Sequence, residues 1–397
     1  METLKKRLDV LKEHIYAENI TVMIMGLGSV GTYLLDYLIG RNDPAIKIIV
    51  VGRSAEKMES NCNIIRISAL IRRLNRSKIV IEPNVDFNDI GQMARCFKKY
   101  QPDFLVNTSR AYPGLKYGSI SWGSIRAYGI WSPLAIKYIR NIMEAVEQAD
   151  IPAVVINTSY SDAVIPWMKS AGKSYPDFGS GNLNHLIPRI KYAIAEILGI
   201  EDFWNIEVVL ATSHFHDVVI SKEGHTEGME QLLKAAYQGK EIICSQEDIF
   251  SRCRIPMPVD AKRNMMNASS NYEIITCIID SIRDGRKRRI FSPGVFGEIG
   301  GYPVEVEAGP EGPDIHIDTS TFSLESMRLA NRKSIFLDGV EEIEGGSLVY
   351  TDSLLEKVEK SFGVSLPKKI GFEEADQVAG MIIQKIILPA LEKKQGG

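Results

Sequence analysis

The segment ITVMIMGLGSVGTYLLDYLIGR, residues 20 to 41, decides the fold of this chain. It begins with a short apolar run typical of a buried strand and ends with apolar residues at helical spacing. The sequence GLGSVG between them matches the pattern GxGxxG. Gly26 permits the tight turn, Gly28 lets a phosphate group approach the backbone, and Gly31 lets the helix pack closely on the strand. The segment therefore predicts a strand, turn and helix that bind a dinucleotide.

Segments of the same kind follow along the chain. Four further strands are predicted, at residues 47–51, 78–82, 103–107 and 152–157. Helical segments lie between them, and strands that alternate with helices indicate an α/β fold with a doubly wound parallel sheet. We therefore expect a dinucleotide-binding Rossmann domain over residues 1–157, of which residues 1–18 form a helical N-terminal extension.

The composition changes after residue 157. Helical patterns mix with segments such as IEVVLATSHFHDVVIS (206–221), whose apolar spacing favours antiparallel strands. This part predicts an α+β catalytic domain over residues 158–345, followed by a C-terminal extension, 346–397, that packs on it. Before it, the stretch 111–131 is rich in Gly, Ser, Tyr and Trp and is long for a simple connection. We expect this stretch to be an active-site loop that moves over the substrate.

The end of the second predicted strand bears on the choice of cofactor. Domains that select NAD place Asp or Glu there, whereas this chain has Gly52-Arg53-Ser54. Arg53 and Ser54 favour NADP(H) because they would bind its 2′-phosphate, with NAD as the alternative. In the other interpretation, Arg53 stacks on adenine or points to solvent. The predicted cofactor site also includes Ser29, Val30, Asn107 and Thr108.

The middle of the chain resembles the lactate/malate dehydrogenase superfamily, and the likeness rests on spacing. The matching residues are, in order, Asn157, Trp167, Gly179-Ser180-Gly181, Arg189, and His214 or His216. The segments GYPVEV (301–306) and FSLESMRLANRKS (322–334) resemble the family's closing strands and last helix. The resemblance covers about residues 20 to 334. It implies that Arg189 binds a substrate carboxylate and that one of the two histidines moves the proton; the alternative for Arg189 is a surface ion pair.

Two positions depart from the family's pattern. The family's catalytic Asp should stand three residues before the arginine, where this chain has Leu186. The predicted substitutes that hold the histidine's other nitrogen are His185, Asn184 and Asp217. Because a neutral partner stabilises an imidazolium less than a carboxylate does, we expect the working histidine to titrate lower than in the family. The second departure is the sequence HFHD (214–217) in place of His-Gly-Asp.

The pattern His-x-His leaves alternatives open. On a strand, His214 and His216 would share one face, which suits an acid/base histidine with a helper, two metal ligands or a pair of structural histidines. No third ligand is evident, so no metal site is predicted. The family resemblance implies that Arg126 polarises the reacting carbonyl, with Arg110 as the alternative, or else that Arg126 is a plain loop arginine. Asn157 is predicted to hydrogen-bond the reacting oxygen, or else to form an Asx turn.

Composition limits the remaining choices. The chain has 397 residues, 45% hydrophobic residues and a formal net charge of -3, which favour neither a nucleic-acid nor a membrane partner. Its five cysteines form no CxxC pair and its N-terminus does not read as a signal peptide, so we expect a cytoplasmic protein. We expect a homodimer or homotetramer.

The activity implied is that of an NAD(P)-dependent oxidoreductase acting on a carbonyl/alcohol or imine/amine carbon of a small anionic substrate. Two alternatives stay open. One is a redox-neutral nicotinamide-dependent enzyme, such as an epimerase, a lyase or a glycosidase-like protein. The other is a catalytically inert dinucleotide sensor.

Overall fold

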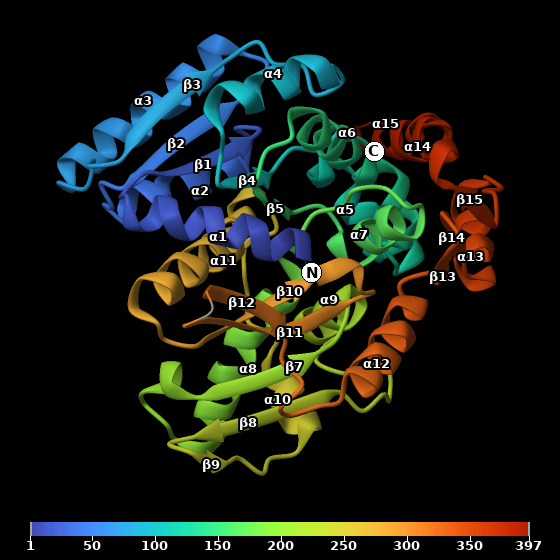
Figure 1. The fold of residues 1–397 in the computed structure, drawn as a ribbon. Helices are drawn as coiled ribbons and strands as arrows, with labels where there is room; N and C mark the ends of the chain where they lie inside the picture. The colour runs from blue at the N-terminus through green and yellow to red at the C-terminus, as the bar shows by residue number, and fades with distance from the viewer. Residues whose placement is uncertain (1, 311, 396–397) are drawn as a thin grey trace.

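The computed structural model describes residues 2–310 and 312–395, and a six-stranded parallel sheet forms its N-terminal half (Figure 1). The strand order is β3-β2-β1-β4-β5-β6. The strands are β1 Ile20–Met25, β2 Ile46–Val51, β3 Lys78–Glu82, β4 Phe104–Asn107, β5 Val154–Asn157 and β6 Phe178–Gly179. This is the order of a doubly wound dinucleotide-binding sheet, so the predicted α/β fold class is confirmed.

The first strand lies in the middle of the sheet, and every residue in it is buried. Ile24 pairs with Val50 of β2 on one side and with Val106 of β4 on the other. Asn107 pairs with Asn157 at the ends of β4 and β5. The carboxyl ends of these parallel strands therefore meet at one edge, where ligands bind in sheets of this kind.

Helices cover both faces of the sheet. On one face lie α1 Glu2–Tyr16, α2 Ser29–Gly40, α3 Ala55–Ile71 and α11 Asn264–Asp284, and on the other α4 Ile90–Tyr100 and α6 Ser132–Ala149. Because side chains alternate along a strand, Val22 and Ile24 enter the first apolar core while Met23 and Met25 enter the second. The sheet is thus insulated on both sides and opens only at its edges.

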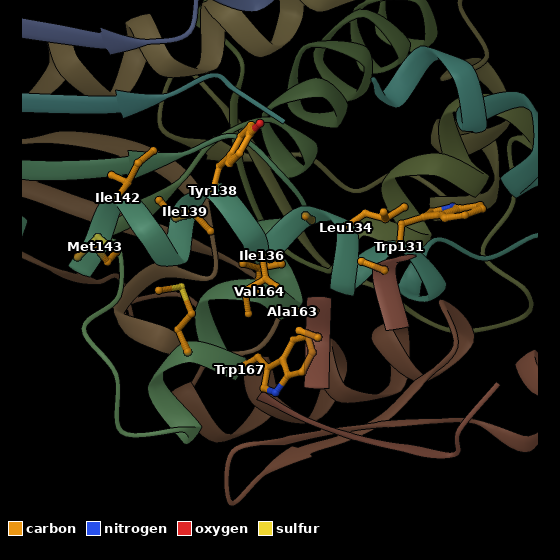
Figure 2. Close-up of a cluster of buried hydrophobic side chains, with 14 of the residues drawn as sticks. Trp131, Leu134, Ile136, Tyr138, Ile139, Ile142, Met143, Ala163, Val164 and Trp167 are labelled. Atoms are coloured by element: carbon orange, nitrogen blue, oxygen red, sulfur yellow. The ribbon is translucent and has the colours of Figure 1, made fainter. Parts of the chain in front are cut away.

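The apolar core around α6 joins distant parts of the chain (Figure 2). Ile139 of α6 and Trp167 of α7 (Ser161–Ser170) are fully buried in it. The Trp167 ring packs edge-on against Phe372, with ring centroids 5.9 Å apart. Truncating a buried Trp to Ala typically costs about 3–5 kcal/mol, so Trp167 helps to anchor the C-terminal segment.

The second half of the chain carries three small antiparallel sheets and further helices, as the predicted α+β arrangement requires. The strands are β7 Glu207–Ala211, β8 Leu232–Tyr237, β9 Lys240–Glu241, β10 Arg288–Pro293, β11 Gly301–Gly309, β12 Gly312–Ile317, β13 Val340–Glu344, β14 Ser347–Tyr350 and β15 Lys369–Gly371. The helices are α8 Asn182–Leu198, α9 His214–Glu223, α10 Gln246–Arg252, α12 Leu324–Leu337, α13 Asp352–Phe362, α14 Ala375–Ile382 and α15 Leu388–Gln395. None of the helices among the described residues has the length and apolarity that crossing a membrane requires.

The prediction of a strand across residues 206–221 is wrong. The strand β7 ends at Ala211, and α9 begins at His214. Ser213 has extended backbone angles at the N-cap position, and the buried carboxylate of Asp162 accepts the amide of His214 at 3.0 Å. This bond satisfies one of the free amides at the start of the helix, so it favours a helix over a continued strand.

The stretch 111–131, expected to be an active-site loop, lines the cavity described below and is more regular than a simple loop. The stretch contains α5 Gly114–Ile120, a π-helical turn and a 3-10 turn. Tyr117 and Trp131 are buried in the core of α6, with ring centroids 4.7 Å apart. Aromatic packing therefore orders this stretch, and its movement over a substrate stays a prediction.

The C-terminal segment 346–395 packs on both halves of the chain. The helix α14 lies against α6 of the Rossmann half, and β14 contacts α7. Figure 1 shows α14 and α15 beside α6 and the strands β13 to β15 beside α7. The segment therefore contacts the Rossmann half as well as the second half, and its assignment to the second domain stays a prediction. The predicted domain boundaries at residues 157 and 345 stay a prediction.

Candidate active site

A cavity of about 980 Å³ opens at the carboxyl edge of the parallel sheet. The glycine turn and the end of β2 line one part of it, and α8, α9 and the start of α11 line the other. The predicted site residues that reach this cavity are Gly26, Gly28, Ser29, Val30, Arg53, Ser54, Thr108, His185, Arg189 and His214. The fold thus brings the expected cofactor turn and part of the expected catalytic set to one space.

The glycine turn has the backbone geometry that its sequence indicates. Gly26 has a φ angle of 99°, which side chains disfavour. A Cβ atom on Gly31 would lie 2.1 Å from the carbonyl oxygen of Gly26, so only glycine lets α2 start this close to β1. A Cβ on Gly28 would meet no atom within 4 Å, which leaves open space beside the start of α2. This turn therefore fits a pyrophosphate at a helix N-terminus.

The side of the cavity near the end of β2 is positively charged. Arg53 and Lys57 line it, and neither makes a hydrogen bond or salt bridge within the described residues. Ser54 is the N-cap residue of α3, but its hydroxyl makes no capping hydrogen bond. These three side chains are therefore available to an anionic group.

The two polar residues after β4 differ in position. Thr108 lines the cavity and donates its hydroxyl to the Gly26 carbonyl at 2.6 Å, which holds the glycine turn. Asn107 instead donates to Asn157 Oδ1 at 2.9 Å and accepts from Ser109, so both ends of its amide are used inside the protein. Asn107 does not line the cavity, so the predicted contact between Asn107 and a cofactor in this cavity does not fit the structure.

His214 stands at the start of α9 with a carboxylate behind it. Its Nδ1 lies 2.9 Å from Oδ2 of Asp338, a residue with no exposed surface. The Tyr160 hydroxyl donates to the same oxygen at 2.8 Å, and the amide of Tyr128 donates to Oδ1 at 2.7 Å. The rings of Tyr128 and Tyr160 also pack edge-on against the imidazole. Asp338 thus fixes the ring and its tautomer.

The environment of His214 favours its charged form. Burial lowers the pKa of this imidazole, but the carboxylates of Asp338 and Asp162 outweigh burial, and the net pKa is raised above the ordinary value. Nε2 makes no hydrogen bond within the described residues. The expectation that this histidine titrates lower than in the family assumed a neutral partner, and that assumption is wrong because the partner is the side chain of Asp338.

The partner of His214 was not among the residues that the sequence suggested. Asn184 donates to the Ser270 hydroxyl and the Phe291 carbonyl and does not reach the cavity. His185 and Asp217 do reach it, but neither bonds to the His214 ring. Asp338 follows the last residue of α12, where an acidic residue usually signals an exposed helix end. No local pattern marks it as buried.

His216 lies away from the cavity. Its Nδ1 is 2.7 Å from the Ser334 hydroxyl, its Nε2 is 3.2 Å from the Thr226 carbonyl, and it is fully buried. Burial lowers its pKa to about 4, so it stays neutral. Because the first turn of a helix sends His214 and His216 in different directions, neither the helper nor the paired-ligand interpretation fits. His216 is therefore a structural histidine.

Arg189 lies on α8 and is only 3% exposed, yet it is one of the residues that line the cavity. Its Nη1 donates to the carbonyls of Cys253 and Ile255, and Nη2 contacts the Met257 sulfur. Its Nε has no partner, and no carboxylate forms a salt bridge with it among the described residues. This geometry excludes the surface ion pair and leaves a buried cation facing the cavity.

His185 and Asp217 form a second polar pair in the cavity. His185 Nδ1 and Asp217 Oδ2 are 3.9 Å apart, which is beyond hydrogen-bond distance. Burial and the cations of Arg263 and Arg189 lower the pKa of His185 to about 3, so it is neutral. Burial raises the pKa of Asp217 to about 6.

Two other predicted catalytic residues are occupied elsewhere. Arg126 forms salt bridges with Glu223 and Glu227 and does not line the cavity, whereas its alternative, Arg110, does. Asn157 is fully buried; its amide donates to Ser159 and Ser161 and accepts from Asn107. Both were expected at the reacting carbonyl, and the structure places neither there.

Clusters that could hold a metal lie outside this cavity in the described part of the chain. They are Glu223, His225 and Glu227, and Glu307, Asp314 and His316, all at least partly exposed. Arg126 already neutralises the first cluster. The cavity itself is therefore organised around an imidazole and cations.

The chain has an α/β first half with a doubly wound parallel sheet and an α+β second half, and its fold is that of the malate and lactate dehydrogenases. Malate dehydrogenase from Cryptosporidium parvum superposes with a TM-score of 0.52 at 14% identity, covering 81% of this chain and 98% of the other. Malate dehydrogenase from Aeropyrum pernix gives 0.51 at 16% identity, with 80% and 97% covered.

A structure with bound ligands shows the same likeness. The lactate dehydrogenase of Cryptosporidium parvum, complexed with lactic acid and nicotinamide adenine dinucleotide, gives a TM-score of 0.51 at 16% identity, with 81% of this chain and 97% of the other covered. No protein-family model and no curated sequence matches the chain. The likeness is therefore one of fold, as expected for a divergent sequence.

Proposed function

We propose that this protein is an oxidoreductase that transfers a hydride between NADP(H) and a carbonyl/alcohol or imine/amine carbon of a small carboxylate-bearing substrate. The carrying observation is the 2.9 Å contact between His214 Nδ1 and Asp338 Oδ2 in the cavity that also holds the glycine turn. An imidazole with one nitrogen held by a buried carboxylate and the other free is the arrangement of a general acid/base.

In this proposal His214 donates a proton from Nε2 during reduction and takes it back during oxidation. Asp338 keeps the Nδ1 proton in place and stabilises the imidazolium. The hydrogen bonds from Tyr160 and Tyr128 hold Asp338 in turn. They pair both oxygens of its side chain, so this buried polar group is satisfied away from water.

Arg189 binds the substrate carboxylate. A buried guanidinium without a carboxylate partner is costly, and a ligand carboxylate would supply the missing charge. The contacts to the Cys253 and Ile255 carbonyls fix its plane in advance. The ligand therefore meets an arginine that is already oriented.

The glycine turn, Thr108 and the start of α2 would hold the dinucleotide. The bound nicotinamide would supply the hydride chemistry that no side chain provides. The preference for the phosphorylated cofactor rests on Arg53, Ser54 and Lys57, since no carboxylate stands at the end of β2 to repel a 2′-phosphate. The lactate dehydrogenase with this fold was solved with nicotinamide adenine dinucleotide, which has no 2′-phosphate. The proposed preference for NADP(H) therefore rests on this chain's own residues and not on that neighbour.

The proposal is tested by incubating the protein with NADPH and a panel of 2-oxo acids, with and without ammonium, and following the absorbance of the reduced nicotinamide. We expect stoichiometric oxidation of NADPH with at least one acid. Tight NADPH binding without turnover across the panel would instead favour an inert sensor. The cytoplasmic location and the homodimeric or homotetrameric state stay predictions, and light scattering of the purified protein tests the latter.

A further inference from the structure

The part of the cavity next to His214 is lined by both positively charged side chains and a carboxyl group. Three cations line it: Arg189 on α8, Lys222 on α9 and Arg263 before α11. Arg263 makes no side-chain hydrogen bond or salt bridge within the described residues. Against them stands Asp217 on α9, and the other carboxylate in the lining, Asp260, caps the turn 261–263. Asp217 therefore stands close to these cations, and the charges of Arg189 and Arg263 act on its carboxyl group.

Asp217 lines the cavity without a hydrogen bond to its side chain from the described part of the chain. Its residue is 5% exposed, and Oδ1 is buried and unbonded there. Oδ2 comes no closer than 3.9 Å to His185. It stands three residues after His214 on α9, so the two side chains lie on neighbouring positions of one helical face. A ligand atom held by His214 is therefore beside Asp217.

An unpartnered buried carboxylate oxygen destabilises the free protein, and buried polar groups are rarely left unpaired. A ligand that gives Asp217 a hydrogen bond removes this cost. The ligand must at the same time bond to His214, because that contact carries the proton transfer. The ligand therefore needs a hydrogen-bond donor for Asp217 and, beside it, a second donor or an acceptor for His214.

The number of protons on the reacting heteroatom separates the ligand classes. A hydroxyl has one O–H, which the reaction commits to His214, whereas an ammonium or iminium nitrogen has further N–H donors for Asp217. The charged groups around His214 favour the same class of ligand as this count of N–H donors. His214 is surrounded by three buried carboxylates, Asp162, Asp217 and Asp338, which favour a cation at the reacting end.

We propose that the substrate carries a cationic nitrogen on the carbon next to its carboxylate, and that Asp217 selects this nitrogen over a hydroxyl. The inference rests on the proposed function and narrows it to an amine/imine couple, in which Arg189 binds the carboxylate. On reduction the iminium carbon gains a hydride, the C=N electron pair moves to nitrogen, and His214 gives that nitrogen a proton. The products are the protonated amine and the oxidised nicotinamide.

The test is equilibrium binding by titration calorimetry to the protein saturated with NADP⁺. The probes are matched pairs: glycine and glycolate, alanine and lactate, phenylalanine and phenyllactate, with both enantiomers of the chiral acids. We expect at least one amino acid to bind about tenfold or more tightly than its hydroxy partner, since charge-assisted hydrogen bonds are about twice as strong as neutral ones.

The variant Asp217→Asn keeps the shape and removes the charge. It should abolish the preference for the amino member while leaving the hydroxy member's affinity unchanged. The matched control Asp260→Asn, at the other carboxylate of the lining, should keep the wild-type preference.

The outcomes separate the two proposals. Hydroxy acids that bind as tightly as amino acids, or an amino preference that survives in Asp217→Asn, would overturn the role of Asp217 and leave the proposed oxidoreductase standing. If no probe of either kind bound, both proposals would fail, because the anion site at Arg189 would then be inactive.

Discussion

The glycine turn and His214 line one cavity, but the glycine turn and the contact between His214 and Asp338 are built in opposite ways. Gly26, Gly28 and Gly31 stand within six residues of one strand, turn and helix, so local backbone geometry creates their site. His214 and Asp338 are 124 residues apart and meet because α9 packs against α12. The difference teaches that a site made by one segment can be recognised in the sequence, whereas a site made by packing depends on the whole fold.

The largest effect is expected from comparing two histidines of α9. His214→Gln should lower kcat/KM for reduction by about 10²- to 10⁴-fold, because it removes the general acid. His216→Gln should leave the activity nearly unchanged but lower the free energy of unfolding by about 1–3 kcal/mol, because it disturbs the buried bond to Ser334. Steady-state kinetics and urea unfolding measure the two effects. Equal losses of activity at equal stability would break the distinction between them.

The variant Asp338→Asn tests the long-range contact itself. The carboxylate raises the pKa of His214, so its loss should lower that pKa. Reduction needs the imidazolium, and its rate falls as pH rises through the folded-state pKa; the alkaline limb of the rate profile should therefore move to lower pH. We expect kcat/KM at neutral pH to fall about 10²-fold. The exposed Asp352→Asn serves as the control, and an unmoved alkaline limb in Asp338→Asn would rule out the pairing.

The same contact has a signature in stability. A histidine whose folded pKa exceeds its unfolded value stabilises the protein below the unfolded pKa, and this contribution is lost as pH rises through the folded pKa. Urea unfolding of wild type and Asp338→Asn across this pH window separates the linkage from the catalytic effect.

On the cofactor side, Arg53→Ala should weaken NADPH binding by about 1.5–3 kcal/mol, which is about 10- to 150-fold. Nicotinamide fluorescence measures this change, and NADH binding is the internal control that should stay constant. A parallel loss of affinity for both cofactors would mean that Arg53 contacts a part that they share, such as the adenine.

The smallest expected effect comes from two glycines of one turn. In Gly31→Ala the new methyl group meets the Gly26 carbonyl, and the overpacking should cost about 1–3 kcal/mol of unfolding free energy. In Gly28→Ala the methyl group enters open space, so stability should hold while the dinucleotide is displaced. Thermal unfolding and cofactor titration of the two variants should therefore give opposite patterns; matching patterns would contradict this geometry.

The sequence predicted the parallel sheet and its glycine turn well because each depends on neighbours in the chain. It misplaced the segment after Ala211, since apolar residues resume at 218–220 and the whole segment then reads as strand. The helix begins there because Asp162 holds the His214 amide, and that contact belongs to the folded state. The alternating apolar pattern that indicates a strand was therefore overridden by a tertiary hydrogen bond that favours a helix.

The carboxylate that bonds to His214 also could not be identified from the local sequence. The sequence suggested His185 and Asn184 near Arg189, where the family's Asp stands, and Asp217 near the histidine. In this chain Asp338 enters from the far end of the fold, and its burial could not be read from its neighbours Leu337 and Gly339. Arg126 failed for a related reason, since its acidic partners lie on another element.

The C-terminal cover of α6 has a consequence for the chain as it leaves the ribosome. Synthesis proceeds from the N-terminus, and domains generally fold as they emerge. The parallel sheet and its turn are complete long before α14 arrives, and in that interval the apolar side of α6 has no cover. Such surface is prone to aggregate, so this nascent protein is suited to assistance by chaperones until its last helices are made.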